Sequence, residues 1–540
     1  MPWLLRLNKV AVLSLFAFLT PWLLQAEVFT SDICVYGSTS GGVVAAVQAA
    51  RMGKSVTLVD PGRHLGGMTS GGLGWVDFGF KEAIGGMSRE FIERIIAHYP
   101  NLPEAEWKQG PGWTFEPHVA EAVFREMLTE AKVPFYPNEE LVSATKDGAR
   151  LREITMANGD VFRAKMFIDA TYEGDLMARA HVSYTIIRES NAQYGETING
   201  ILVKTPSCNS LKLAIDPYVK PGDPSSGLLP LVQSDPAGEP GAGGPAHTAQ
   251  AYNYRLCLTQ DPANKIPIEP PPDYDPARYE LVLRLLDAAQ AQNIGVTLST
   301  APQKLALLKI DPLPNGKTDV NNNGWVSTDY VGGSADYPEA DYATRRKIAR
   351  EHENYIRGLL HFLATSPRLP ESIRSEMQKW GLCRDEFQDT GGWPFQLYVR
   401  ESRRLIGAYV MTEHDCWSQT TLDDSIGRGS YPMDSHAFRR LVRDGVVASD
   451  GGCYFPMKTS YPISYRAITP KAEECENLLV PACLSASHAA YASVRMEPVF
   501  MILGQSAATA AALAIDGNVP LQKIDIKKLQ TRLQADKQLL

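Results

Sequence analysis

The chain has 540 residues, of which 61 are acidic and 53 are basic, and its formal net charge is −8. This acidic balance, without a basic tract, argues against nucleic acid and against an anionic membrane surface as partners. The length exceeds what one ordinary hydrophobic core organises, so we expect two interleaved domains or one domain with a large insertion.

Residues 1–26 have the pattern of a secretory signal peptide. Two basic residues precede the apolar run 10–19, and Ala26 supplies a small residue for cleavage. An uncleaved anchor is the alternative, but this run is short for a spanning helix. We expect cleavage after Ala26 and export to the periplasm or the extracellular medium. We also expect no later apolar run long enough to span a bilayer, so the processed protein should have no stable membrane anchor.

The cysteine pattern does not predict a compact metal site. None of the eight cysteines has C-x-x-C spacing, which argues against zinc ribbons and iron–sulfur clusters, and we predict no metal. Cys34 lies in an apolar strand and should pack there as a small hydrophobe, which leaves at least one further free thiol. Candidate disulfide pairs are Cys475 with Cys483 and Cys416 with Cys453.

Residues 31–60 predict a strand, a tight turn, a helix and a second strand, in "DICVYG", "GGVVAAVQAARMG" and "KSVTLVD". Gly37 and Gly42 are the outer glycines of a G-x-G-x-x-G turn whose middle position is Thr39. Gly37 permits the sharp exit from the strand, and Gly42 lets the helix pack on the sheet. Backbone N–H groups at the helix start should bind a pyrophosphate, and the Thr39 hydroxyl should donate to it. The predicted phosphate site comprises Gly37, Ser38, Thr39, Ser40, Gly41 and Gly42.

An acid and a second glycine pair follow this unit. Asp60, at the end of the second strand, should accept hydrogen bonds from ribose hydroxyls, which suits NAD and FAD equally. The doublet Gly66–Gly67 favours FAD, because side chains there would collide with the ribityl chain or the flavin ring. The alternative for this doublet is a flexible surface loop, and the alternative for the whole unit 31–60 is a βαβ unit that binds nothing. The cofactor-binding residues predicted here are Asp60, Pro61, Gly62, Gly66, Gly67 and Met68.

Residues 190–460 do not resemble part of the nucleotide sheet. Loops rich in proline and glycine occupy 236–247 and 267–276, and periodic patterns predict helices at 277–293 and 340–367. The segment 319–325 begins like a calcium loop but lacks the closing glutamate, so we expect an asparagine-rich turn. The neighbouring tyrosines and aspartates would suit a carbohydrate or an ordinary surface loop.

Near the carboxyl end, Gly504 is predicted to open a helix of small residues that ends near Gly517. From spacing alone, a buried alanine-rich helix is the favoured interpretation. Alternatively, its first N–H groups would lie near the flavin pyrimidine. The residues concerned are Gly504, Gln505, Ser506 and Ala507.

Several segments together resemble FAD-dependent oxidoreductases of the glutathione-reductase-like class, with a distant likeness to the flavoproteins of the heterodisulfide reductase group. They are "YGSTSGGVVAA", "HLGGMTSGGLG", "FIDATYEGDLMARA", "GGWPFQLYVRESRRLIGAYVMTEHD" and the segment 485–514. The resemblance implies an α/β fold in which a discontinuous Rossmann-like FAD-binding domain carries a large inserted α+β substrate or cap domain. The expected boundaries are 27–190 and 461–517 for the FAD domain, 191–460 for the insertion and 518–540 for a C-terminal helix or tail.

The same resemblance nominates further cofactor contacts. In such proteins "IDATYEGD" resembles the strand end that turns back over the FAD, which nominates Ala170, Thr171, Gly174 and Asp175. The strand "EELVSAT" corresponds to the segment whose main chain reads adenine, which nominates Val142. The likeness also favours the flavin interpretation of the Gly504 helix.

Oxidation of an alcohol or amine at a flavin needs a base for the heteroatom proton. His488 is the candidate base, because it precedes the Gly504 helix and an imidazole pKa of about 6.5 suits proton transfer. Arg495 would neutralise a substrate anion or reduced flavin, and Glu497 would orient either group. A purely structural role is the alternative for each. Tyr398, Arg400 and Arg404, on a predicted helix, are further candidates, and His64 is a candidate for a covalent flavin link.

We therefore predict an exported FAD-dependent oxidoreductase that transfers a hydride between flavin and a small organic substrate, with a sugar-derived compound as one option. Two alternatives stay open: a carbohydrate-processing lyase or hydrolase with non-redox FAD, and a non-catalytic binding protein on a flavin fold. The sequence specifies neither the substrate, nor the electron acceptor, nor the oligomeric state.

Overall fold

The computed structural model describes residues 26–203, 213–234, 238–324 and 326–540. The predicted signal peptide lies outside these residues except for Ala26, so its removal and the export stay predictions.

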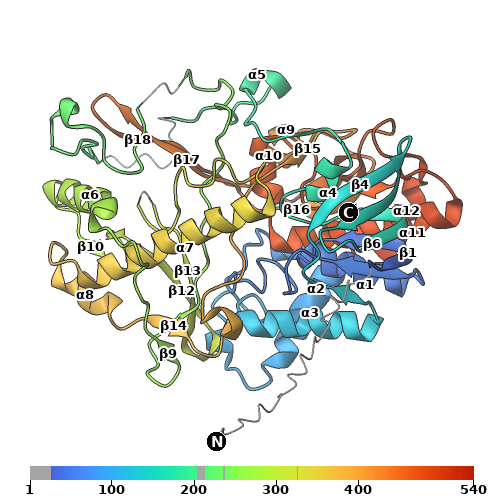
Figure 1. The fold of residues 1–540 in the computed structure, drawn as a ribbon, viewed down its shortest axis with the longest axis horizontal. Coiled ribbons are helices and arrows are strands. Elements are labelled where there is room, and N and C mark those ends of the chain that lie inside the picture. The colour runs from blue at the N-terminus through green and yellow to red at the C-terminus, as the bar shows by residue number, and fades with distance from the viewer. Residues whose placement is uncertain (1–25, 204–212, 235–237, 325) are drawn as a thin grey trace, which may run out of the picture.

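A seven-stranded sheet lies on the right-hand side of the molecule in Figure 1. Its strand order is β3-β2-β1-β6-β5-β4, and β20 pairs with β6. The five strands β3, β2, β1, β6 and β20 are parallel, whereas β4 and β5 form an antiparallel hairpin beside them. The strands are β1 (Val28–Tyr36), β2 (Val56–Val59), β3 (Phe135–Tyr136), β4 (Leu141–Asp147), β5 (Arg150–Met156), β6 (Val161–Asp169) and β20 (Leu478–Leu479).

The strand register brings three predicted segments to one edge of this sheet. Tyr36 of β1 pairs with Val59 of β2 and with Asp169 of β6. The glycine turn, Asp60 and the "ATYEGD" segment each follow one of these strand ends. Because ligands of open parallel sheets bind beyond the carboxyl ends of the strands, this edge is where a dinucleotide would be expected. The predicted Rossmann-like α/β fold is confirmed.

Helices cover this sheet, and two of them approach very closely. They are α1 (Ser40–Arg51), α2 (Gly86–His98), α3 (Pro117–Ala131), α4 (Asp175–Arg179), α10 (His488–Val494), α11 (Glu497–Gly517) and α12 (Ile526–Ala535). A Cβ on Gly504 of α11 would lie 2.1 Å from the carbonyl oxygen of Gly41 in α1. A Cβ on Gly41 would lie 2.7 Å from the carbonyl oxygen of Phe500. Glycine at both positions therefore lets the backbones of α1 and α11 touch.

The prediction that Gly504 opens a helix is wrong, because α11 begins at Glu497. The four nominated residues, Gly504, Gln505, Ser506 and Ala507, lie about two turns inside the helix, where N–H groups donate to carbonyls of the preceding turn. The glycine in the sequence marks a close helix crossing rather than a helix start.

Among the described residues, α11 alone has the length and apolar composition to cross a membrane. The expectation that no later apolar run is long enough to span a bilayer is therefore wrong as far as length and composition are concerned. However, 89% of its apolar window is buried inside the protein. Its apolar character is accounted for by packing in the core.

The elements between residues 191 and 460, as far as the structure describes them, contribute no strand to the seven-stranded sheet. A five-stranded sheet of order β12-β13-β8-β14-β9 lies there, with α6 and α8 beside it in Figure 1 and α7 running from it toward the first sheet. The predicted helices 277–293 and 340–367 correspond to α6 and α7. The elements are α5 (Asn191–Tyr194), β8 (Leu258–Thr259), β9 (Lys265–Ile266), α6 (Glu280–Ala291), β12 (Lys309–Leu313), β13 (Lys317–Asn321), α7 (Tyr342–Thr365), α8 (Glu371–Met377), β14 (Gly381–Cys383) and α9 (Glu413–Cys416).

Shorter pairings connect the two regions, and one long hairpin projects from them. The two-stranded sheets are β7 (Tyr184–Thr185) with β15 (Arg404–Leu405), β10 (Val296–Thr297) with β11 (Leu305–Ala306), β16 (Ser425–Gly429) with β19 (Tyr461–Ser464), and β17 (Met433–Arg443) with β18 (Val446–Phe455). The β7–β15 pair joins residues on either side of the five-stranded sheet in the chain, so the second region is anchored at both ends.

The cysteines bear out one prediction and contradict another. Cys34 is fully buried as a free thiol in β1, as expected for a small hydrophobe. Cys416, Cys475 and Cys483 are also free and buried, so neither predicted disulfide pair forms. The asparagine-rich segment begins inside β13, because residues 319–321 end that strand. Asp319 is buried against Arg255 at 2.7 Å, so this carboxylate is not free for calcium.

Candidate functional site

A first cavity, of about 610 Å³, lies at the carboxyl edge of the seven-stranded sheet. The second region closes it with residues of α7 and with the segment 393–396. Its lining from the nucleotide unit comprises Ser38, Thr39, Asp60, Gly62, Arg63, His64 and Gly67, together with Asn138. We refer to it as the nucleotide cavity.

The two outer glycines of the turn are required by the protein backbone itself. Gly37 has a φ of +103°, and a Cβ there would lie 2.6 Å from the backbone nitrogen of Thr171. A Cβ on Gly42 would lie 1.8 Å from the carbonyl oxygen of Gly37. The turn can therefore hold this shape only with glycine at both positions.

Thr39 caps α1 instead of offering its hydroxyl to a ligand. Its Oγ1 accepts from the backbone N–H of Gly42 at 3.3 Å and donates to the carbonyl oxygen of Ala170 at 2.7 Å. The expectation that this hydroxyl donates to a phosphate is not met in this arrangement. The first N–H groups of a helix lack intrahelical acceptors, so an anion at this end would be bound by the backbone.

Asp60 closes the turn and faces the nucleotide cavity. Its carboxylate accepts from the N–H groups of Ser38 at 2.5 Å and Gly62 at 2.6 Å. Burial raises the pKa of Asp60, although these hydrogen bonds oppose the shift. A carboxylate offers about four acceptor sites, so it retains capacity for ribose hydroxyls. Pro61, the next residue, is half-buried and does not line the cavity.

The second glycine pair is shaped by aromatic neighbours. A Cβ on Gly66 would lie 2.4 Å from the ring of Phe124, and one on Gly67 would lie 2.2 Å from the hydroxyl oxygen of Tyr172. That hydroxyl accepts from the N–H of Met68 at 2.9 Å. The loop thus runs tightly along the nucleotide cavity, but only Gly67 of these three residues lines it.

Of the contacts nominated by resemblance, four cluster behind the turn. Ala170 accepts from Thr39, and Thr171 donates to Asp169 at 2.7 Å and accepts from the N–H of Gly174 at 3.0 Å. Asp175 forms ion pairs at 2.7 Å with Arg345 and at 2.9 Å with Arg403. This carboxylate therefore joins the two regions of the protein.

Val142 lies on β4 with an exposed side chain and is not among the residues that line the nucleotide cavity.

A second cavity, of about 310 Å³, lies next to the first. The segment 393–400 separates them, because Trp393, Phe395 and Gln396 line the nucleotide cavity whereas Tyr398 and Arg400 line the second. Met496, which precedes α11, also faces the second cavity. Its charged and hydroxyl-bearing lining includes Asp77, Lys309, Asp329, Tyr398, Arg400, Tyr431, Asp434, His436, Arg440 and Arg495. We call it the substrate cavity.

Glu497, a predicted catalytic residue, lies between the starts of α1 and α11. Its carboxylate accepts from Ser40 Oγ at 2.6 Å, Thr69 Oγ1 at 2.7 Å and Tyr172 Oη at 2.6 Å. Burial raises its pKa, and these hydrogen bonds oppose that rise. Its contacts make it a positioning residue that joins both helices to the glycine loop, since it does not line the substrate cavity.

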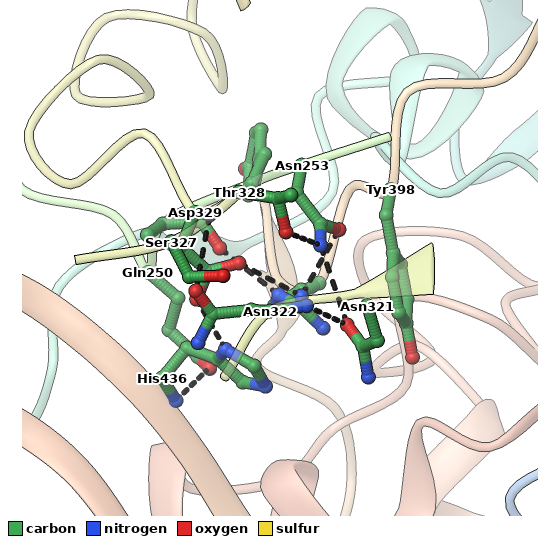
Figure 2. Close-up of polar contacts among 12 residues, drawn as sticks. Gln250, Asn253, Asn321, Asn322, Ser327, Thr328, Asp329, Tyr398 and His436 are labelled. Atoms are coloured by element: carbon green, nitrogen blue, oxygen red, sulfur yellow. Dashed lines mark hydrogen bonds and ion pairs between the residues drawn. The ribbon is translucent and has the colours of Figure 1, made fainter. Parts of the chain in front are cut away.

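His436, which sequence reasoning missed, is the histidine of the substrate cavity. Its Nδ1 lies 2.5 Å from Asp329 Oδ2, and Asp329 Oδ1 accepts from Arg400 Nη2 at 3.0 Å (Figure 2). Burial alone would raise the pKa of Asp329, but the charges of His436 and Arg400 hold it below its usual range. With a proton on Nδ1 the ring donates to Asp329, and in this tautomer of the neutral imidazole Nε2 is the nitrogen that can accept a proton.

A weak sequence signal for His436 was present. Asp434 and His436 alternate along β17, and alternate residues of a strand share one face. Asp434 Oδ2 lies 3.7 Å from His436 Nε2, beyond hydrogen-bond distance. Burial raises the pKa of Asp434, but His436 and the nearby arginines bring it down to about 2.

His488, the predicted base, is buried outside the substrate cavity. Its Nδ1 lies 2.7 Å from Glu401 Oε2, and its ring meets the ring of Phe438 edge-on. Glu401 also accepts from the side chain of Gln250, whose own carbonyl oxygen accepts from the backbone N–H of His436 at 2.9 Å (Figure 2). His488 therefore supports the position of His436 through two intervening side chains.

Of the remaining residues predicted to take part in catalysis or flavin attachment, some line a cavity and one is buried in the core. Residues 398–403 are irregular, so the predicted helix there is wrong, and β15 begins at Arg404. Tyr398 and Arg400 line the substrate cavity, whereas Arg404 is fully buried and pairs with Glu189 at 2.5 Å. His64 lines the nucleotide cavity with its ring stacked on Phe395, at 3.9 Å between centroids.

One group of side chains in the described part of the chain has the spacing of a metal site: Glu116, His118 and Glu386. The ammonium group of Lys317 lies 2.7 Å from Glu116 and 2.6 Å from Glu386. A lysine therefore already supplies the positive charge between these carboxylates.

The family match of this chain agrees with a nucleotide site at the glycine turn and Asp60. Residues 32–533 match the family model described as FAD dependent oxidoreductase. No curated protein matches the sequence significantly.

Solved structures give only partial alignments. Thioredoxin reductase of T. acidophilum aligns at 18% identity over 26% of this chain and 34% of its own, with a TM-score of 0.17. A mutant flavin monooxygenase from Stenotrophomonas maltophilia aligns at 17% identity over 26% and 38%, with a TM-score of 0.18. A 3-ketosteroid dehydrogenase from Rhodococcus jostii RHA1 aligns at 15% identity over 29% and 50%, with a TM-score of 0.20. This chain therefore spans half or less of the length of each of these proteins.

Proposed function

The chain belongs to the family of FAD-dependent oxidoreductases, and from that premise we propose that it is an exported enzyme that transfers a hydride between FAD and a small, polar, hydroxyl-bearing substrate. The observation that carries this proposal is the His436–Asp329 pair in a polar cavity adjoining the nucleotide cavity. The signal-peptide pattern of residues 1–26 supports export.

The nucleotide cavity fits the cofactor of this family. The glycine turn and the start of α1 would hold the pyrophosphate, Asp60 would hold a ribose, and the Gly67 loop would follow the chain toward the flavin. Bound FAD supplies a two-electron acceptor for a substrate hydride.

His436 has the surroundings of a general base. An alcohol that loses a hydride from carbon must also lose its hydroxyl proton. His436 lines the substrate cavity, and because its Nδ1 is paired with Asp329, we assign Nε2 as the proton acceptor. Asp329 fixes the tautomer through Nδ1 and stabilises the imidazolium that forms. Arg400 keeps Asp329 ionised and oriented. Such a base contributes about 10²- to 10⁴-fold in rate.

The test is His436→Asn in the FAD-loaded enzyme. A panel of polyols, sugars and sugar acids is first screened for anaerobic bleaching of the flavin by the wild-type protein. The variant should retain bound FAD but reduce it about 10²- to 10⁴-fold more slowly with the same compound, because the proton acceptor is gone.

His488→Asn is the matched control. Because His488 lies outside the cavity, this substitution should slow flavin reduction by less than about tenfold. An unchanged reduction rate in His436→Asn would remove His436 from the mechanism. If no compound bleaches the flavin but a polysaccharide is cleaved, the protein is instead a lyase or hydrolase.

A further inference from the structure

We propose that the substrate carries a carboxylate and that Arg495 binds it in the substrate cavity. This inference rests on the proposed function and narrows its substrate to hydroxy acids, such as aldonic or uronic acids. It is carried by the unusual surroundings of the Arg495 guanidinium.

Arg495 is 3% exposed, and no carboxylate of the described residues lies within the 4.0 Å of an ion pair. Its Nη1 donates to the hydroxyl oxygen of Tyr398 at 3.3 Å, and its Nη2 donates to the carbonyl oxygen of Asp434 at 2.8 Å. Its buried Nε has no acceptor. Burial alone would lower the pKa of Arg495, but Tyr398 and the charge of Asp434, from beyond ion-pair distance, raise it. The guanidinium thus has a negative charge nearby but no direct carboxylate partner. A direct partner for this buried group would have to enter the cavity.

Three other buried arginines of this protein form ion pairs with carboxylates. Arg188 lies 2.8 Å from Asp450, Arg255 lies 2.7 Å from Asp319, and Arg404 lies 2.5 Å from Glu189. These three have carboxylate partners within the fold, whereas Arg495 lines an open cavity. The difference points to a partner that arrives from outside.

None of the three acids of the substrate cavity forms a direct ion pair with Arg495. Asp329 serves His436 and Arg400, and Asp77 accepts from the hydroxyl of Tyr431 at 3.2 Å. Asp434 lies 3.7 Å from His436 Nε2, and its charge contributes to the raised pKa of Arg495 from beyond ion-pair distance. The lining holds four lysine or arginine side chains, Lys309, Arg400, Arg440 and Arg495, against these three acids. Lys309 is paired with Asp311, outside this set, at 3.3 Å, so the remaining three arginines and three acids balance, and the case for an anionic occupant rests on Arg495.

His436 and Arg495 enter this cavity from different elements, β17 and the end of α10. A substrate that bridges them needs a hydroxyl for His436 Nε2 and an anionic group for Arg495. A planar carboxylate matches the fork of a guanidinium, and a cavity of about 310 Å³ suits a small molecule of this kind.

The experiment compares matched acid and neutral compounds: D-gluconate with D-glucitol, D-glucuronate with D-glucose, and D-glycerate with glycerol. Binding to the FAD-loaded protein is measured by calorimetry, and flavin reduction is measured anaerobically. At least one acid should bind about tenfold or more tightly than its neutral partner, because only the acid can pair with Arg495.

Arg495→Met should weaken binding of that acid by about 30- to 100-fold and change its neutral partner by less than about threefold. Arg495→Lys keeps the charge, so the affinity for that acid should fall by less than about tenfold. This variant replaces Arg495→Met in the test if the methionine variant is unstable. Lys309→Met removes another positive charge of the same cavity. Because Lys309 is already paired with Asp311 at 3.3 Å, we expect this variant to lower the affinity for the acid less than Arg495→Met does.

The outcomes separate the two proposals. If neutral compounds bind and reduce the flavin as well as the acids do, the carboxylate proposal is overturned while the redox function stands. If Arg495→Met shifts the flavin midpoint potential but leaves the affinity for acids intact, Arg495 serves the reduced flavin and the proposal is also overturned. If an acid binds through Arg495 but no compound reduces the flavin, the proposed function fails and the binding site stands.

Discussion

Single residues in the glycine turn have separate tasks. Thr39 stands where a third glycine was expected, and its side chain fastens the turn to Ala170 while capping α1. Gly37 adopts a φ of +103° with the backbone of Thr171 against it. The departure at Thr39 is therefore compatible with the turn, whereas a side chain at Gly37 is not.

Two substitutions at the turn should differ sharply in FAD content. Thr39→Gly removes the cap, which costs only a few tenths of a kcal/mol at an N-cap, and should retain FAD. Gly37→Val forces a β-branched residue into a left-handed conformation with a Cβ 2.6 Å from a backbone nitrogen, and should abolish FAD binding. The ratio of flavin to protein absorbance after purification measures both. Copurification of FAD with the valine variant would show that the turn is misplaced.

At the level of elements, the contact between α1 and α11 connects the two halves of the FAD-binding region. Gly41 and Gly504 face each other at backbone distance, and Glu497, two turns before Gly504, accepts a hydrogen bond from Ser40, the neighbour of Gly41. The orientation of α1, and with it the anion-binding end, depends on this crossing.

Gly504→Ala should separate the two helices, because its Cβ would lie 2.1 Å from the carbonyl oxygen of Gly41. We expect destabilisation of about 1–3 kcal/mol and weaker FAD retention, as for overpacking in a core. Gly517→Ala is the control on the same helix, since its Cβ would lie an ordinary 3.5 Å from Val519. Chemical denaturation and flavin content report the effect. Equal behaviour of the two variants would contradict a tight crossing.

At the scale of the whole molecule, buried charges join the FAD-binding region to the second region. Glu401 links His488 and Arg404, and Arg404 also pairs with Glu189. Burial would raise the pKa of Glu401, but His488 and Arg404 lower it to about 2. The folded protein therefore holds this carboxylate ionised at a pH where the unfolded chain would protonate it.

This network predicts a pH dependence of stability. Because the folded pKa lies below the usual value near 4.5, the contribution of Glu401 is complete above that pH and is lost as the pH falls toward 2. The shift corresponds to a contribution on the order of 3 kcal/mol at neutral pH. Glu401→Gln should lower the Tm strongly at pH 7, and the gap to the wild-type protein should narrow as the pH is lowered toward 3.

Glu371→Gln is the control for this comparison, since Glu371 pairs with Arg374 on an exposed surface and should change the Tm little. A gap between Glu401→Gln and the wild-type protein that is equal at pH 7 and pH 3 would contradict the linkage.

The sequence by itself determined the nucleotide unit, because its constraints are local. A strand, a turn with Gly37 and Gly42, a helix and Asp60 follow one another within 30 residues, and short-range sterics allow few other arrangements. The family resemblance extended this to a discontinuous FAD-binding domain. Local spacing also led to errors, since Gly504 has the pattern of a helix start although it serves a helix crossing.

Only the tertiary structure decided which histidine faces a substrate. His488 is nearer to α11 in sequence, but β17 carries His436 to the cavity, where Asp329 and Arg400 come from segments 107 and 36 residues away in the chain. The lack of a direct carboxylate partner for Arg495 among the described residues likewise follows from what surrounds this side chain in space. Side-chain electrostatics depend on distances of a few ångströms between distant segments, and no periodicity in the sequence encodes those distances.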